Sequence, residues 1–395
     1  MLYETGQSLW AIIHPMTDSI SLPPIWIDKP NHLFHLVNIL NRQPQVAIDT
    51  ESNSLFAYQE QVCLIQFSIP EQDYLVDPIA LPDLSSLAGF FATPKIEKVF
   101  HAAEYDLICL KRDFEFEFNN IFDTMQAARI LGRQNVGLAS MLESELGVII
   151  EKKYQRANWG ERPLPAAMLS YARVDSHYLI SLRNILYKEL LEEGLLELAM
   201  EDFRRVTQVT PGNIEVEAPA WWRLHGSQEL TPQQASVLQA LVDYRDQQAR
   251  QADLPHFKVL SNETLVQIAA EAPLTWDALA DIPSLSARNR ERHAQGLMAA
   301  VKRGLALPPP RRPVNNRRGD AEMERLEALR KWRKETGSKL AVESDVILPR
   351  DILEEIAHKA PATPSALRTI MKDVPWRYER FGSHILDTIR RKELT

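Results

Sequence analysis

Val46-Ala47-Ile48-Asp49-Thr50-Glu51 is a short apolar run that passes directly into two acids separated by a single residue. The run predicts a strand that ends at these acids. Side chains alternate along a strand, so Asp49 and Glu51 should project to the same side and can share one site. Acids at this spacing are also common on solvated strand faces, so the pair alone leaves both interpretations open.

Short β-prone runs recur at residues 62–67 and 98–100, and helical patterns at 84–91 and 124–131 alternate with them. This alternation predicts an α/β domain built around a mixed sheet with flanking helices. Beyond residue 170 the β signals fade, and the remainder is compatible with helices and connectors.

Two further acidic segments follow along the chain. Asp106 comes just after a β-prone run, where a helix is expected to begin; an acid there is also a common way to stabilise a helix dipole. Tyr171 and Asp175 lie four residues apart within 164–190, a strongly helical segment, so their polar ends can reach one point.

These acids matter as a set, because four carboxylates from three separated segments suit hard divalent cations. Two such ions about 4 Å apart activate a water and stabilise the leaving oxygen in phosphodiester hydrolysis. We therefore expect two divalent ions, Mg²⁺ or Mn²⁺, and no organic cofactor. Tyr171 is expected to orient or deprotonate the water, with its pKa lowered by the ions.

The set Asp49-x-Glu51, Asp106 and Tyr171-x-x-x-Asp175 resembles that of the DEDDy exonucleases, and its surroundings resemble ribonuclease D in particular. The supporting segments are residues 46–52, Leu64-Ile65-Gln66, Ile121-Phe122-Asp123-Thr124, Trp159 and Arg162-Pro163-Leu164. The resemblance covers most of the chain. One departure is Asn158, which stands where this family is expected to have an acid.

This resemblance implies a ribonuclease H-like α/β exonuclease fold in which Asp49, Glu51, Asp106 and Asp175 bind two metal ions and Tyr171 positions the water. It also implies a 3′→5′ exoribonuclease that releases 5′-mononucleotides. The implied substrates are RNA 3′ ends, in particular those of transfer RNA precursors and other small stable RNAs. Protein partners are not indicated.

An ungapped internal repeat occupies the rest of the chain, with residues near 240–303 matching residues near 328–391 at an offset of 88. Val259-Leu260 matches Ile347-Leu348, and Ala272-Pro273 matches Ala360-Pro361. The repeat predicts two copies of one small all-α unit. These units resemble the HRDC domain, which helps to hold structured RNA in this family.

The expected organisation follows from the repeat and from two segments of low periodicity, one of them rich in Pro and Arg. By residues, it is an N-terminal extension 1–24, an exonuclease domain 25–208, a linker 209–226, a first HRDC-like helical domain 227–305, a Pro/Arg-rich linker 306–318 and a second HRDC-like helical domain 319–395.

Charge is distributed unevenly over the 395 residues. The formal net charge is −8, whereas residues 301–395 hold 21 Lys and Arg against 14 Asp and Glu. The basic C-terminal quarter favours binding to phosphate backbones. The acidic residues 1–300 can still act on nucleic acid when their carboxylates hold cations. The sequence has no long apolar run and no signal-peptide pattern, and its two cysteines lie in apolar stretches, so we expect a cytoplasmic protein without membrane association.

Basic residues in two segments are candidate RNA contacts. One cluster precedes the last acidic motif, where it can grip phosphates at the mouth of the site, although a solvated basic loop is an equal alternative. The other lies in the Pro/Arg-rich linker. The candidates are Lys152, Lys153, Arg156, Arg162, Arg311 and Arg312.

Two other functions stay open from the sequence. A DNA-directed 3′→5′ exonuclease of the same superfamily would use the same carboxylates, because a preference for the 2′-hydroxyl cannot be read from these motifs. A non-catalytic RNA-binding protein would keep the fold and work through its helical domains.

Overall fold

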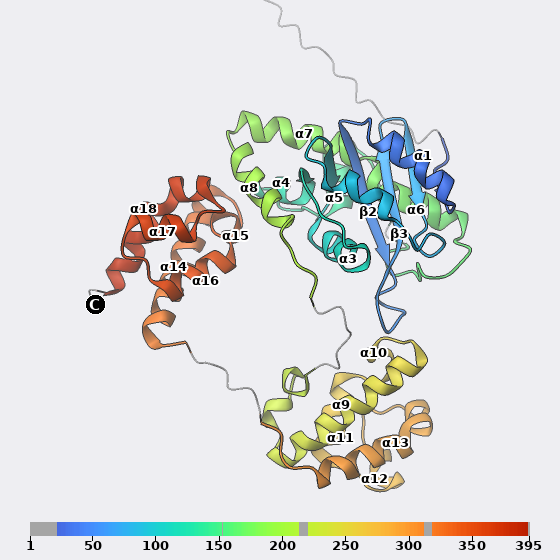
Figure 1. Ribbon diagram of the computed structural model, residues 1–395. Helices are drawn as coiled ribbons and strands as arrows, with labels where there is room; N and C mark the ends of the chain where they lie inside the picture. Colours follow the sequence, from blue (N-terminus) through green and yellow to red (C-terminus); the bar gives the residue numbers. More distant parts are fainter. Residues whose placement is uncertain (1–21, 152, 213–219, 312–317, 394–395) are drawn as a thin grey trace, which may run out of the picture.

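The computed structural model describes residues 22–151, 153–212, 220–311 and 318–393 (Figure 1). An α/β domain, blue to green in the figure, is followed along the chain by two helical units, yellow and red. Most of the expected extension 1–24 and the middle of both expected linkers lie outside the described residues, as do Lys152 and Arg312.

The described part of the α/β domain contains one six-stranded sheet of order β1-β4-β3-β2-β5-β6. β3 runs antiparallel to β2 and β4, whereas β2, β5 and β6 are parallel. The strands are β1 (Ile25–Ile27), β2 (Gln45–Ser52), β3 (Val62–Ile69), β4 (Gln72–Val76), β5 (Glu97–Phe100) and β6 (Ile121–Asp123). The predicted mixed sheet is confirmed. β2 extends to Ser52, so Asp49 and Glu51 belong to the strand's hydrogen-bonded ladder.

Helices cover both faces of this sheet. They are α1 (Pro30–Leu40), α2 (Ala88–Ala92), α3 (Glu104–Phe114), α4 (Thr124–Ile130), α5 (Leu138–Leu146), α6 (Ala166–His177), α7 (Leu179–Glu192) and α8 (Leu196–Val206), with a 3-10 turn η1 (Ser85–Leu87) before α2. The segment 164–190, expected as one helix, divides at Tyr178 into α6 and α7. The two halves pack into different cores, which explains the division: Met168 and Ala172 of α6 join one cluster, whereas the leucines of α7 join another.

Alternation along β2 assigns its side chains to opposite faces. Val46 and Ile48 belong to the core under α1, α2 and α3, and Thr50 contacts α3 on the same side. Ala47 packs in the cluster that contains α7, so Asp49 and Glu51 face the side covered by α6 and α7. The sheet therefore presents the acid pair to α6.

The remaining described segments are helical and form two units with the same order of long and short helices. The first unit contains α9 (Pro232–Ala252), α10 (His256–Val259), α11 (Asn262–Glu271), α12 (Trp276–Ala280) and α13 (Ala287–Ala306), preceded by 3-10 turns η2 (Trp221–Arg223) and η3 (Ser227–Glu229). The second contains α14 (Asp320–Leu340), α15 (Ser344–Ile347), α16 (Arg350–Lys359), α17 (Pro364–Ile370) and α18 (Pro375–Glu393).

The predicted repeat reappears as matching contacts at the same offset. Arg245 donates to the Leu260 carbonyl at 3.1 Å, and Arg333 donates to the Leu348 carbonyl at 3.0 Å. Ala272 and Ala360 end α11 and α16 with φ values of 45° and 44°, each directly before the proline of the sequence match. Two copies of one helical unit are thus confirmed.

Both helical units contact the α/β domain. Tyr58, in the loop between β2 and β3, donates from its hydroxyl to Asp246 of α9 at 2.8 Å and from its backbone N–H to Asp253 at 3.0 Å. The second unit contacts α8 through Arg377. Among the described residues, no helix has the length and apolarity needed to cross a membrane.

Candidate metal centre

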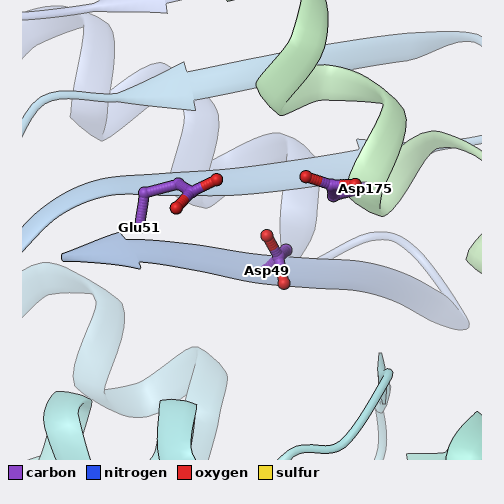
Figure 2. A group of neighbouring side chains, drawn as sticks. All are labelled: Asp49, Glu51 and Asp175. Carbon is purple, nitrogen blue, oxygen red and sulfur yellow. The ribbon is translucent and has the colours of Figure 1, made fainter. Parts of the chain in front are cut away.

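Three carboxylates meet where α6 crosses β2. Asp49 and Glu51 come from the strand and Asp175 comes from the helix, and one oxygen from each lies within 4.8 Å of the others (Figure 2). The spacing of two along a strand places the first pair, and α6 brings the third acid from more than 120 residues later in the chain. The structure therefore unites three of the four predicted metal ligands.

A pocket of about 310 Å³ opens over these acids. Tyr171 lines it one helical turn before Asp175, as their spacing predicted. Its ring is held by Tyr154 and Trp159, with centroids 5.7 and 6.2 Å away. Tyr171 thus lines the same cavity as the carboxylates.

Burial and mutual repulsion make ionisation of these acids unfavourable. Burial, followed by repulsion from Asp49, Asp175 and Asp106, raises the pKa of Glu51 to about 10. Burial raises the pKa of Asp175 to about 7, and burial with repulsion from Asp175 raises that of Asp49. The donor set fits a hard divalent cation, because such an ion prefers carboxylate oxygens and would replace this repulsion with attraction.

The pKa of Tyr171 shifts upward in the protein alone, opposite to the lowering expected with ions bound. Burial is the first cause, and the negative charges of Asp175, Glu51 and Asp49 add to it by disfavouring a phenolate. The hydroxyl therefore keeps its proton at neutral pH in this electrostatic environment.

Asp106, the fourth predicted ligand, lies in the first turn of α3 but outside the group of three. Its carboxylate accepts a hydrogen bond from Thr50, whose side chain leaves β2 on the face opposite to Asp49. Burial and the charge of Asp49 nevertheless raise the pKa of Asp106, so the two acids lie close enough to interact. Asp106 thus lies near the three carboxylates, but its contact with β2 is on the face of the strand opposite to Asp49.

The back of α6 is fixed to the sheet by a buried ionic network that the sequence analysis did not identify. Asp73 of β4 accepts two hydrogen bonds from Arg173, at 2.9 and 2.6 Å, and one from Ser68 at 2.7 Å. His177 Nδ1 lies 3.0 Å from both Asp73 oxygens. Arg173 and His177 point away from the face that carries Tyr171 and Asp175, so this network sets how α6 presents those two residues.

Asp123 ends β6 and directly precedes α4. It caps α4 by accepting from the backbone N–H groups of Met125 and Gln126, and it accepts from those of Ala102 and Ala103 just before α3. An acid that ends a strand and begins a helix is the sequence signal for such a cap. Asp123 thereby fixes the turn from which Asp106 projects.

The basic residues expected to contact RNA differ in their exposure and in their hydrogen bonds within the protein. Lys153 and Arg156 are exposed in the loop before α6, and Arg311 is exposed at the end of a described segment. Arg162 donates to Asp77 at 2.8 and 2.6 Å and to the carbonyls of Trp159 and Cys63. Because these partners occupy its guanidinium, the geometry argues against the expected phosphate contact of Arg162.

Comparisons with known proteins agree with this architecture. A family model of a 3′-5′ exonuclease matches residues 24–191, and an HRDC domain model matches residues 234–301 and 322–389. The chain is 30% identical to ribonuclease D of Nitrobacter hamburgensis over 355 residues, which cover 88% of this chain and 90% of that protein.

The chain also resembles larger eukaryotic proteins. It is 33% identical over 266 residues to the exosome complex exonuclease RRP6 of Saccharomyces cerevisiae, which covers 63% of this chain and 36% of that protein. It spans roughly a third to a half of the length of this protein and of three RRP6-like proteins of Arabidopsis thaliana.

Among solved structures, Escherichia coli RNase D, described as an exoribonuclease involved in structured RNA processing, is similar with a TM-score of 0.68. That match has 25% sequence identity and covers 94% of this chain and 99% of the other. The similarity therefore extends over the catalytic domain and both helical units.

Proposed function

Because the chain belongs to the ribonuclease D family, we propose that it is a metal-dependent 3′→5′ exoribonuclease that removes single nucleotides from RNA 3′ ends. The observation that carries the proposal is the group of Asp49, Glu51 and Asp175, three carboxylates with oxygens within 4.8 Å at the floor of an open pocket. Such a group can bind a hard divalent cation through oxygen ligands alone.

Asp49, Glu51 and Asp175 would hold the divalent ions, Mg²⁺ or Mn²⁺, and Asp106 would complete the set. We include Asp106 because its charge contributes to the raised pKa of Glu51. The charge of Asp49 contributes in the same way to the raised pKa of Asp106. When bound, two such ions would supply Lewis-acid activation of the phosphodiester and charge neutralisation at the leaving oxygen.

The chain's own groups would then orient the reactants. Tyr171, which lines the pocket, can hold the attacking water by a hydrogen bond from or to its hydroxyl. The N-terminal end of α5 also lines this pocket. Hydrolysis of the terminal phosphodiester would release a 5′-mononucleotide.

We propose structured RNAs as the substrates, transfer RNA precursors among them, by analogy with the structured-RNA role given for the Escherichia coli protein. The basic C-terminal quarter supports this choice, because cationic helices next to the catalytic domain favour phosphate backbones. Exposed Lys153, Arg156 and Arg311 are the proposed contacts in the described residues. Both cysteines are buried and unpaired, which suits a reducing cytoplasm.

The test is degradation of 5′-labelled single-stranded RNA and of DNA of the same sequence, with Mg²⁺ or Mn²⁺ and with or without chelator. Stepwise shortening of RNA from its 3′ end, abolished by the chelator, is the expected result. Preferential shortening of DNA would identify a DNA exonuclease, and binding without shortening of either polymer would identify a non-catalytic RNA-binding protein.

A further inference from the structure

Gln66 lies in the middle of β3, and its side chain is fully buried. Within the part of the chain that the structure describes, neither its amide nitrogen nor its amide oxygen has a hydrogen-bond partner. Leaving a buried polar group unpaired destabilises the folded state, and folded proteins pair nearly all such groups.

The side chain of Gln66 faces α6. Two residues earlier, Leu64 packs in the cluster that contains Met168 and Ala172 of this helix. Two residues later, the hydroxyl of Ser68 lies 2.8 Å from that of Ser176. Because alternate residues of a strand share a face, Gln66 lies between these two contacts and under the same helix.

The register places Gln66 beside the metal centre. In the antiparallel pairing of β2 with β3, Gln66 is directly opposite Asp49, and Leu64 is opposite Glu51. Side chains directly opposite one another in such a pair have Cβ atoms about 4.5–5.5 Å apart. α6, which contributes Asp175, covers both strands at this level.

We propose that Gln66 is a positioning residue of the metal centre, whose amide N–H donates to the Asp49 carboxylate and fixes the oxygen that Asp49 offers to a divalent ion. The proposal rests on the proposed function, since it requires these carboxylates to hold a cation. Hydrogen bonds to ligating carboxylates orient the ligands of metal sites in general. This bond would give the buried amide the partner that it otherwise lacks among the described residues.

The experiment compares Gln66→Met with the full-length wild type in two measurements that need no RNA. Met preserves the length of the side chain and removes both polar atoms. In chelator, the variant is expected to melt at the same temperature as the wild type or a higher one, because an unpaired polar group is replaced by an apolar one. In calorimetric titration with Mn²⁺, its affinity should fall by about 10–100-fold, the range for residues that orient metal ligands.

Leu64→Met is the matched control. It changes the neighbouring position on the same face of β3, opposite Glu51, without removing a hydrogen-bond donor. Its Mn²⁺ affinity should stay within about twofold of the wild type, since no group that orients a metal ligand is lost.

A lower melting temperature for Gln66→Met in chelator would show that the amide is a paired structural group and would overturn the inference. Unchanged Mn²⁺ affinity in this variant, with a wild type that binds Mn²⁺, would overturn it as well and leave the proposed function intact. Failure of the wild type itself to bind Mn²⁺ would overturn the proposed function and the inference together.

Discussion

Arg377 of α18 donates to the Glu201 carboxylate of α8 at 3.0 Å, and neither side chain is more than 1% exposed. Arg377 also reaches Asp202 at 2.8 Å and the Val346 carbonyl at 3.0 Å. Glu201 accepts in addition from the backbone N–H of Trp376. A buried ion pair with further hydrogen bonds on both partners thus joins the second helical unit to the catalytic domain.

Arg377→Leu should loosen this junction, because it leaves Glu201 buried without its cation. Breaking a buried pair on one side costs about 3–5 kcal/mol, whereas replacing both partners with apolar residues is often close to neutral. Urea unfolding of Arg377→Leu, Glu201→Leu and the double variant measures the coupling. The double variant should recover most of the loss, and a single variant as stable as the wild type would contradict the role of the pair. Lys359→Ala, at an exposed pair within α16, is the control expected to change little.

Asp73 should contribute stability that disappears in acid. Burial favours its protonated form, but the hydrogen bonds from His177, Ser68 and Arg173 outweigh this and lower its pKa below the ordinary value of 3.8. A group with a lowered folded-state pKa contributes stability above its unfolded pKa and loses it as the pH falls through the folded value. Asp73→Asn should therefore destabilise the protein by about 3–5 kcal/mol at pH 7.

The difference between this variant and the wild type should shrink below about pH 4, where Asp73 of the unfolded chain becomes protonated. Denaturant unfolding at pH 7 and pH 3.5 measures the change. A difference independent of pH would show that the network acts through packing alone. Glu143→Gln, at an exposed acid on α5, is the control.

Asp175→Asn should separate chemistry from binding. It removes one of the three clustered carboxylates, so turnover of RNA should fall by more than about 100-fold, the upper range for residues that only support a ligand. RNA affinity should change little, because contacts to the phosphate backbone supply most of it. Single-turnover degradation and a binding titration at the same salt concentration measure the two quantities. Glu143→Gln, at an exposed acid on α5, should leave both unchanged, and equal losses of affinity and turnover in Asp175→Asn would contradict the division.

Local spacing explains why the core of the centre could be predicted from the sequence. Asp49 and Glu51 share a face because strands alternate, and Tyr171 and Asp175 share one because helices repeat about every four residues. The offset of 88 residues likewise predicted two helical units, and matching contacts such as that of Arg245 with Leu260 confirm them.

The remaining features depend on pairings that local pattern does not specify. Gln66 faces Asp49 only because of the β2–β3 register, and Arg173 meets Asp73 across a separation of 100 residues. The basic cluster before the last acidic motif predicts an RNA contact for Arg162, but local pattern does not reveal its partner Asp77, which lies 85 residues earlier in the chain. β4 and β6 have five and three residues, too few for a reliable alternation.

Tyr171→Phe should distinguish a tyrosine that orients the water from one that deprotonates it. The ring contacts with Tyr154 and Trp159 remain in Phe, so the melting temperature and Mn²⁺ affinity should be unchanged. The rate should fall by about 10²–10⁴-fold, the usual contribution of a positioned proton donor or acceptor. Tyr154→Phe, which keeps the neighbouring ring, is the control expected to retain most activity.

The pH dependence of the rate loss in Tyr171→Phe distinguishes orientation of the water from its deprotonation. Burial is the first cause of the raised pKa of Tyr171 and persists when Mg²⁺ offsets the carboxylate charges, so its hydroxyl should stay protonated from pH 6 to 9 and the ratio of wild-type to variant rates should be constant. A base must lose its proton first, so the ratio would then grow about tenfold for each pH unit. Rates measured across this range at saturating Mg²⁺ therefore assign the role: a constant ratio supports orientation of the water, and a rising one would make Tyr171 the base.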